Sequence, residues 1–365
     1  MATSARPLRR VTLDFHHDDA AVEAAVVRQD LSACELTGSC LWLGCDETTT
    51  IQRLVRTAAR SFARHRSFAL GQALALPAGP DEEIDIEGFA ADDGFLWIVG
   101  SHSLKRKKPK RRDSAAEALA RLSEVSASPN RYLFARLPLV PAGDGLFELG
   151  GLGETADPHG RTPACLPMAG GRNDLALALA NDVHIGRFVD VPSKENGLDI
   201  EGIAVRGDRV FLGMRGPVLR GWAIILELAV AEAAPGRLAL SPMGEGNEPY
   251  RKHFLDLGGL GIRDLAFDGD RLLILAGPTM DLDGPVRVYR WRDVLAADQG
   301  DVVAADALEP VLEVPFGEGF DHAEGMTLLA EGGAKQLLVV YDSPSPSRLH
   351  DNGTAIDAEI FAVPS

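Results

Sequence analysis

The chain has 365 residues, and its hydrophobic content of 45% is enough for a sizeable core and excludes an intrinsically disordered protein. Its 38 glycines and 22 prolines, with only 6% aromatic residues, are typical of a turn-rich β protein rather than a helical bundle. Fifty-three acidic residues against 37 basic ones give a net charge of −16, so the protein as a whole repels nucleic acids and anionic membranes.

The N-terminal segment is basic, but no apolar stretch long enough for a signal peptide follows it. The longest apolar run, around Trp222–Leu226, is too short to cross a bilayer, so we expect no transmembrane segment and a cytoplasmic protein. The cysteines lack paired C-x-x-C spacing, which argues against a zinc site or a disulfide framework. They are Cys34, Cys40, Cys45 and Cys165.

A short motif recurs along the chain and carries most of the information about the fold. Asp85–Ala90 reads Asp-Ile-Glu-Gly-Phe-Ala and is followed, after a turn, by the apolar run Leu96–Gly100. The pattern returns at Asp199–Gly213 and, with changes, at other places. Two apolar runs separated by turn residues predict a β-hairpin. The predicted hairpins lie near residues 31–45, 86–100, 200–214, 262–276 and 323–341.

Further strands are predicted between the hairpins, which are themselves apolar on both faces, as in sheets that stack around a central axis. Third strands are expected at Thr50–Arg56, Arg131–Leu139, Ala223–Ala229, Val286–Trp291 and Glu359–Val363. Fourth strands are expected at Phe68–Leu76, Arg187–Val191, His253–Leu257 and Val311–Phe316. The missing fourth strand is Val11–Phe15, which we expect to pair with Glu359–Val363 and so close the ring.

These elements predict an all-β fold: a five-bladed β-propeller in a single domain, residues 1–365, closed by its N-terminal strand. A six-bladed propeller is the alternative, because Glu87 and Glu201 are 114 residues apart whereas Glu201 and Arg263 are 62 apart. The extra length holds no further copy of the hairpin. We expect insertions there at residues 103–128, which are basic and alanine-rich, and at residues 141–186, which are loop-like with a helical pattern at Asn173–Ala180.

The Asp-Ile-Glu-Gly repeats resemble a family of bacterial proteins known only as a domain of unknown function. Two further segments carry the resemblance, Gly100–Lys105 (Gly-Ser-His-Ser-Leu-Lys) and Tyr341–Ser345 (Tyr-Asp-Ser-Pro-Ser). The resemblance covers nearly the whole chain and implies a propeller of bacterial origin, without an activity. More loosely, the Glu-Gly repeats are similar to the phytase-like esterase propellers, from which Arg263-Asp264 departs in one blade.

Candidate functional residues follow from the topology, because each innermost strand starts, and each second strand ends, at the same mouth of the central channel. The starts of the innermost strands place at this mouth Ser32, Glu87, Glu201, Arg263 and Glu324. The ends of the second strands add Asp46, Ser101, Arg215, Gly277 and Asp342, followed by Glu47, His102, Gly216, Pro278 and Ser343. We therefore expect a channel mouth with several carboxylates, two arginines and a histidine.

Carboxylates confined to one site need a cation, arginine partners or bound protons. Because oxygen ligands suit Ca²⁺ or Mg²⁺, the candidate metal ligands are Glu87, Glu201, Glu324 and Asp342. In phosphoester chemistry, guanidinium groups would stabilise the transferring oxygens while a carboxylate or the histidine activates water. The candidate catalytic residues are His102, Arg263, Arg215, Asp46 and Glu47. In the competing structural interpretation, the repeat glutamates accept backbone hydrogen bonds from the neighbouring blade.

Two classes of function are therefore open. The first is a metal-assisted hydrolase of a small anionic ester, with a phosphoester the first candidate, acting at the channel mouth. The second is a non-catalytic propeller that binds a protein or carbohydrate partner on its rim. Seven bases within Lys105–Arg112 leave from the same rim. They form a lid over an anionic substrate, a contact with nucleic acid or a membrane surface, or a solvated loop.

Overall fold

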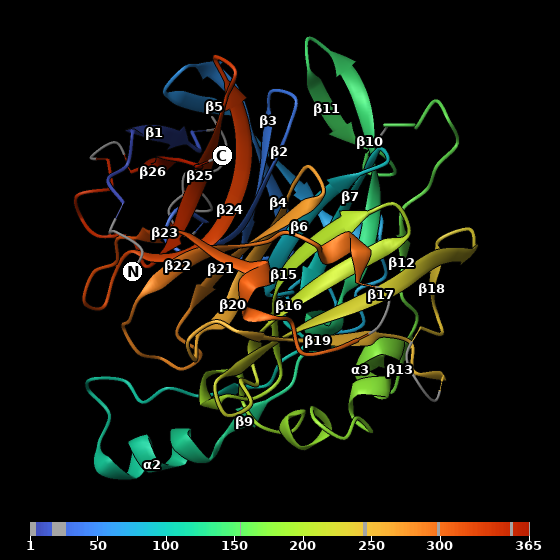
Figure 1. The fold of residues 1–365 in the computed structure, drawn as a ribbon, viewed down its shortest axis with the longest axis vertical. Coiled ribbons are helices and arrows are strands. Elements are labelled where there is room, and N and C mark those ends of the chain that lie inside the picture. The colour runs from blue at the N-terminus through green and yellow to red at the C-terminus, as the bar shows by residue number, and fades with distance from the viewer. Residues whose placement is uncertain are drawn as a thin grey trace.

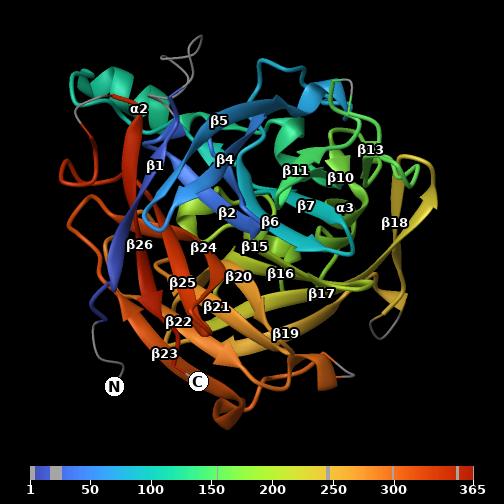
Figure 2. The ribbon, with the colours of Figure 1, turned by 90° about the horizontal axis from the view of Figure 1, so that it is seen from above.

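The computed structural model describes residues 5–16, 27–153, 155–243, 247–297, 300–350 and 353–364. The described chain is built mostly from strands, with few helices (Figure 1). Its sheets form a nearly closed arrangement around a centre, which is consistent with a β-propeller (Figure 2). The all-β class predicted from the sequence is therefore confirmed.

The innermost strands of the described chain follow one another around the centre (Figure 2). They are β2 (Leu31–Thr37), β6 (Ile86–Asp92), β15 (Asp199–Arg206), β20 (Gly261–Asp268) and β24 (His322–Glu331). Each packs against the next in this order, and β24 packs against β2, so their contacts form a closed cycle. Each also pairs antiparallel with the strand that follows it in the chain. These second strands are β3 (Cys40–Cys45), β7 (Phe95–Gly100), β16 (Arg209–Gly216), β21 (Arg271–Gly277) and β25 (Ala334–Asp342).

The outer strands complete the sheets. The third strands are β4 (Thr50–Ala58), β10 (Phe134–Gly143), β17 (Trp222–Ala234), β22 (Val286–Trp291) and β26 (Ala355–Ala362). Outside them lie β5 (Ser61–Ala69), β12 (Ala164–Cys165), β19 (Arg251–Asp256), β23 (Leu308–Val314) and β1 (Arg9–Asp14). β1 pairs antiparallel with β26 and parallel with β5, so the N-terminal strand joins the sheets from the two ends of the chain.

The remaining elements are short or peripheral. The other strands are β8 (Lys105–Arg106), β9 (Val125–Ser126), β11 (Leu146–Leu149), β13 (Met168–Ala169), β14 (Arg172–Asn173) and β18 (Arg237–Ser241). The α-helices of the described residues are α2 (Ala115–Ser123) and α3 (Asp174–Leu179). Single 3₁₀ turns occur at Leu70–Gln72, Pro129–Tyr132, Gly186–Phe188, Ser193–Glu195, Val294–Ala296 and Ala305–Ala307. The helix α3 agrees with the helical pattern expected at Asn173–Ala180.

The outer strand predicted at Arg187–Val191 is wrong. This segment begins with a 3₁₀ turn, and its apolar residue Val189 belongs to the same buried cluster as Leu175 and Leu179 of α3. The alternating pattern therefore reflects packing against a helix. The outer position next to β10 is taken instead by β12.

The outer strand predicted at Phe68–Leu76 begins too late. A tight turn after β4 pairs Ala58 with Ser61, so the return strand β5 starts at once and ends at Ala69. The residues that follow form the turn Leu70–Gln72, in which Leu70 is buried. The apolar residues after Phe68 are therefore core residues of a loop.

The insertion at residues 103–128 is folded, and its helix was not predicted. β8 pairs with β9, and α2 lies between them. The helix begins with a capping box: Ser114 Oγ accepts a hydrogen bond from the Glu117 N–H (3.3 Å), and the Glu117 carboxylate accepts one from the Ser114 N–H (2.8 Å). α2 buries none of its residues and lies apart from the sheets (Figure 1).

A β-bulge recurs at one position of all five innermost strands of the described chain. In each hairpin the antiparallel pairing skips one residue of the innermost strand. The skipped residues are Ser32, Glu87, Glu201, Arg263 and Glu324. A bulge takes its residue out of the ladder and redirects the side chain. The repeat position singled out in the sequence is therefore the bulge position.

Glycine follows the bulge where the next innermost strand passes close by. A Cβ atom on Gly88 would lie 2.9 Å from the side chain of Ile203, and one on Gly202 would lie 3.0 Å from the backbone of Asp264. Both distances are shorter than an ordinary van der Waals contact. The Glu-Gly pair of the repeat thus combines a redirected side chain with a close approach between strands.

The pairing of β1 with β26 predicts that the N-terminal strand stabilises the fold. Deleting residues 1–16 would leave β26 and β5 each with an unpaired edge. We expect the melting temperature, measured by scanning calorimetry, to fall by several degrees, or soluble expression to be lost. Deletion of residues 1–4, which stops before β1, is the matched control. An unchanged melting temperature for the longer deletion would contradict this role of β1.

Candidate functional site

Two groups of carboxylates meet at the bulge positions. Ligand oxygens of Asp46, Asp85 and Glu87 lie within 4.8 Å of one another, as do those of Glu87, Asp199 and Glu201. Asp85 and Asp199 hold the first position of the Asp-Ile-Glu-Gly repeat, two residues before a bulge glutamate. Side chains two residues apart on a strand share a face. This spacing could have predicted Asp85 and Asp199 as site residues, but only the glutamates of the repeat were selected.

The two predicted arginines neutralise part of this charge. Arg215 donates from Nη1 to Glu201, and its Nη2 lies 3.0 Å from Asp199 Oδ2. Arg263 donates from Nη1 to Glu201 Oε2 (3.0 Å) and to Glu324 Oε1 (2.6 Å). All five side chains are buried. The arginines therefore balance acids, and removing either would leave buried carboxylates without a partner.

Arg131 is a third arginine of the cluster, and the sequence interpretation missed it. It lies in the 3₁₀ turn before β10 and is only 4% exposed. Its Nη1 is 2.9 Å from Asp85 Oδ2, and its Nη2 donates to Glu83 Oε1 at 2.6 Å. Asp85 therefore has a cationic partner within the described residues.

Asp46 and Glu87 have no such partner. Glu87 is 8% exposed and makes no hydrogen bond or ion pair with any described residue. Asp46 Oδ1 is buried and likewise has no hydrogen-bond partner in the described chain. Burial, and then the neighbouring carboxylates, raise the pKa of both side chains well above the usual range. Two adjacent carboxylates, one buried and one half-buried, that lack compensating charge are expected to share a proton or hold a cation.

The other predicted acids lie outside the two carboxylate groups. Glu324 pairs with Arg263, and Asp342 Oδ2 lies 3.9 Å from His322 Nδ1. Glu47 is exposed, and its side chain contacts no described residue through a hydrogen bond or ion pair. His322 holds the position in β24 that Asp85 and Asp199 hold in their own repeats, two residues before the bulge.

His102 is locked in place by its neighbours. Its Nδ1 donates to the Gly100 carbonyl oxygen (2.7 Å), and its Nε2 accepts from the Asn173 amide (2.8 Å). The ring packs edge-on against Tyr132. Burial lowers the pKa of His102 to about 4, so the ring is neutral at pH 7. Both ring nitrogens are occupied, so in this structure neither is free to take a proton from water.

Backbone contacts between neighbouring sheets are made by an aspartate rather than by the repeat glutamates. Asp264, which replaces glycine after the bulge in β20, accepts a hydrogen bond from the Met326 N–H of β24 at 2.7 Å. Within the described residues, Glu87, Glu201 and Glu324 accept no hydrogen bond from a backbone N–H. The backbone contacts expected in the structural interpretation are therefore missing, but Glu201 and Glu324 still tie neighbouring innermost strands together through Arg263.

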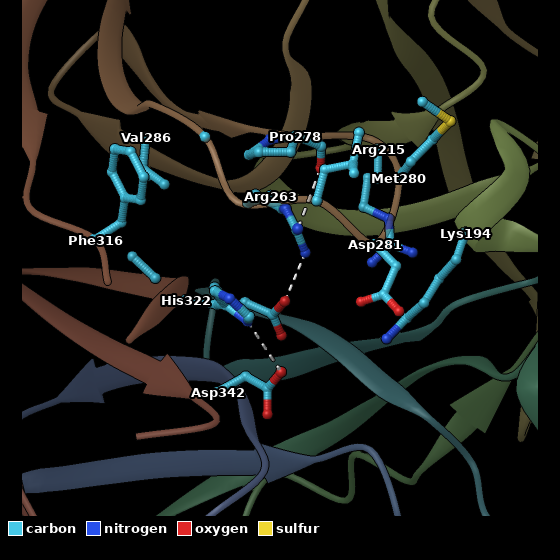
Figure 3. Close-up of a pocket in the computed structure, with 14 residues that line it drawn as sticks. Lys194, Arg215, Arg263, Pro278, Met280, Asp281, Val286, Phe316, His322 and Asp342 are labelled. Atoms are coloured by element: carbon cyan, nitrogen blue, oxygen red, sulfur yellow. Dashed lines mark hydrogen bonds and ion pairs between the residues drawn. The ribbon is translucent and has the colours of Figure 1, made fainter. Parts of the chain in front are cut away.

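A pocket adjoins the acidic cluster (Figure 3). Its cavity volume is about 40 Å³, and the hollow around it is open to solvent. One part of its lining is charged: Lys194, Arg215, Arg263, Asp281, His322, Glu324 and Asp342. The other part is mostly apolar: Pro278, Met280, Leu282, Gly284, Val286, Phe316 and Ala323. Lys194 and His322 were not among the predicted site residues.

The fold and this cluster define a propeller-like β protein with a charged site at its centre. The chain belongs to DUF3616, a family described as a protein of unknown function, whose model matches residues 30–358. The predicted resemblance to a domain of unknown function is thus confirmed. No curated protein matches the sequence. No helix of the described residues is long and apolar enough to cross a membrane.

Several solved structures are similar in fold. Glutaminyl cyclase from Myxococcus xanthus has 7% identity and a TM-score of 0.41, over 99% of this chain and 98% of the other. Regucalcin, a calcium-binding protein from Agrobacterium tumefaciens, has 12% identity and a TM-score of 0.39, over 100% and 97%. Virginiamycin B lyase from Staphylococcus aureus has 8% identity and a TM-score of 0.34, over 97% and 99%. Likeness at this level does not identify an activity.

The buried acids predict a pH dependence of stability. Burial, with Asp342 and Glu201 adding to it, raises the pKa of Glu324 to about 7 even though Arg263 lowers it. Between the ordinary pKa of 4.5 and this value the native state binds more protons than the unfolded state, so the free energy of unfolding falls as pH rises. One such group contributes about 1.4 kcal/mol per pH unit.

We therefore expect Glu324→Gln to flatten the dependence of unfolding free energy on pH between about 4.5 and 7, measured by urea denaturation in EDTA. Asp190→Asn, at an aspartate whose side chain is 81% exposed, is the matched control and should keep the wild-type slope. Identical slopes for Glu324→Gln and the wild type would show that Glu324 ionises normally.

Proposed function

We propose that the sheets form the five blades of one β-propeller domain, closed by β1. The closed cycle of contacts among the innermost strands supports this number of blades. The pairing of β1 with β26 supports the closure. A sixth blade would need another innermost strand between β7 and β15, and the described strands of that interval include none.

We propose further that the channel mouth binds a divalent cation through Asp46, Asp85 and Glu87. The observation that carries this proposal is the pair of carboxylates, half-buried Asp46 and buried Glu87, that have neither a cationic partner nor a hydrogen bond in the described chain. The donor set consists of carboxylate oxygens alone, which suits Ca²⁺ or Mg²⁺. Asp85 would share its charge between the cation and Arg131. Glu201 and Glu324, predicted earlier as ligands, lie outside the group that contains Asp46, have arginine partners, and would act around the cation instead.

The function that this site supports best is the metal-assisted hydrolysis of a small anionic ester, with a phosphoester as the first substrate class. A bound divalent cation would supply Lewis-acid polarisation of an ester oxygen. The adjoining pocket brings cationic side chains to the same place, and these attract the negative charge of the ester. Arg263 and Arg215 hold the acids in place and lie at the edge where such an ester would reach the cation.

The basic segment Lys105–Arg112 was interpreted as a lid, as a contact with nucleic acid or a membrane, or as a solvated loop. Its contacts favour the lid. Lys108 Nζ donates to Asp281 Oδ2 at 2.8 Å, and Asp281 lines the pocket. Both side chains are exposed, so the contact contributes little to stability and breaks readily. We propose that this segment opens and closes over the pocket.

The cation proposal predicts two opposite effects of one substitution. In EDTA, Glu87→Gln should raise the free energy of unfolding, because it removes a buried carboxylate that has no partner. With added Ca²⁺ or Mg²⁺, the wild type should gain about 2.7 kcal/mol at a hundred times the dissociation constant, and the variant should gain little. Urea denaturation with and without the cation measures both effects.

The matched control for this experiment is Asp190→Asn, which also removes one carboxylate charge but at an exposed position. It should leave both the stability in EDTA and the gain from the cation as in the wild type. Titration calorimetry of the EDTA-treated protein that detects no binding of Ca²⁺ or Mg²⁺ would refute the cation site.

The hydrolase proposal predicts turnover that depends on the cation. Purified protein should cleave a generic phosphomonoester or phosphodiester faster than a carboxylester, and only with Ca²⁺ or Mg²⁺ present. Glu87→Gln should reduce kcat by roughly a hundredfold or more, the effect expected for losing a charge-stabilising element. If no ester is turned over under any of these conditions, the non-catalytic propeller that binds a partner on its rim replaces the hydrolase.

A further inference from the structure

Large apolar side chains are exposed around the pocket. Met280, Leu282 and Phe316 line it and are 45%, 62% and 42% exposed. They come from the loop between β21 and β22 and the loop between β23 and β24, on neighbouring sheets. Exposed apolar side chains gathered around a pocket mark a binding surface rather than ordinary surface composition.

The two loops that carry these side chains are tied to each other. Asp283 accepts a hydrogen bond from the Gly319 N–H at 3.0 Å, and its Oδ1 lies 3.1 Å from His322 Nε2. Both loops are therefore held beside the charged part of the pocket. Met280, Leu282 and Phe316, called the apolar wall here, all line this pocket, and Figure 3 shows Met280 and Phe316 at opposite ends of it.

The charged side of the pocket has donors without acceptors. Lys194 is exposed and makes no hydrogen bond or ion pair with any described residue. Arg215 is 6% exposed, and its buried Nε finds no acceptor in the described chain. Partial desolvation beside the pocket and Arg215 lower the pKa of Lys194, but Glu324, Asp281 and Asp342 outweigh them, so the pKa is raised and the amine stays charged. The free amine of Lys194 can donate to the oxygens of an anion, and Arg215, whose unpaired Nε is buried, adds positive charge behind it.

We propose that this pocket binds the phosphate monoester of an apolar alcohol. The phosphate would lie at Lys194 and Arg215, and the alkyl or aryl group would lie against the apolar wall. A phosphate fits better than a carboxylate, because it offers three terminal oxygens and a second negative charge to these donors. This inference names the substrate class of the proposed hydrolase and rests on that function for turnover, but binding is tested without it.

The test is titration calorimetry of the full chain in EDTA with octylphosphonate, whose P–C bond cannot be hydrolysed, below its micelle concentration. We expect it to bind at least tenfold more tightly than methylphosphonate, because only the longer probe reaches the apolar wall. Leu282→Ser should remove most of that advantage and leave methylphosphonate binding unchanged. Lys194→Gln should weaken both probes.

Matched variants and probes separate the contributions of the apolar wall, the phosphate head and the negative charge. Leu177→Ser, at an exposed leucine of α3, and Lys335→Gln, at an exposed lysine of β25 outside the pocket, should leave the binding of both phosphonates unchanged. Equal affinities for octylphosphonate and methylphosphonate, or no effect of Leu282→Ser, would overturn the apolar part. Octanoate bound as tightly as octylphosphonate would overturn the phosphate head, and octyl glucoside bound as tightly would overturn any anion specificity.

The two proposals fail in different ways. If the phosphonates bind as expected but no ester is turned over and no cation binds, the proposed binding pocket is supported and the proposed hydrolase is refuted. If a short phosphoester is hydrolysed with a cation while octylphosphonate binds no more tightly than methylphosphonate, the proposed hydrolase is supported and the apolar substrate class is refuted.

Discussion

The charge balance at the channel mouth is the constraint on which the site depends. A bulge at the same position of each innermost strand turns Glu87, Glu201 and Glu324 out of their ladders. Gathering carboxylates in a buried place costs free energy unless cations accompany them. Arg215 and Arg263 supply this positive charge beside Glu201 and Glu324. Beyond these arginines, Asp46 and Glu87 are left without partners, and this is where we propose that a cation binds.

This uneven distribution of charge puts two kinds of binding side by side. The unpaired acids suit a metal cation, whereas the pocket next to them offers Lys194 and Arg215 to an anion. Neutralisation of the whole ring by arginines would leave no attraction for a cation, and a ring of acids alone would repel an anionic ester. An ester oxygen and a cation can meet only where the two regions touch.

Much of this site follows from the sequence, since the repeat marks the bulge and so predicts Glu87, Glu201, Arg263 and Glu324 as neighbours. The sequence does not indicate which acids acquire partners. Arg131 reaches Asp85 from a turn that sequence reasoning placed in a strand, and Lys194 comes from a loop with no repeat pattern. His102 looked available because its binding partner, Asn173, lies 71 residues away in an insertion. Side-chain partners depend on tertiary contacts that local patterns do not encode.

The most direct test of this account is the position of a bound cation. Crystals of the wild-type protein soaked in Mn²⁺, with diffraction measured at the manganese absorption edge, would locate the ion by its anomalous density. The account predicts a peak in contact with Asp46 and Glu87, and no peak there in Glu87→Gln crystals. Wild-type crystals with no peak at these carboxylates, or with manganese only at exposed acids elsewhere, would contradict it.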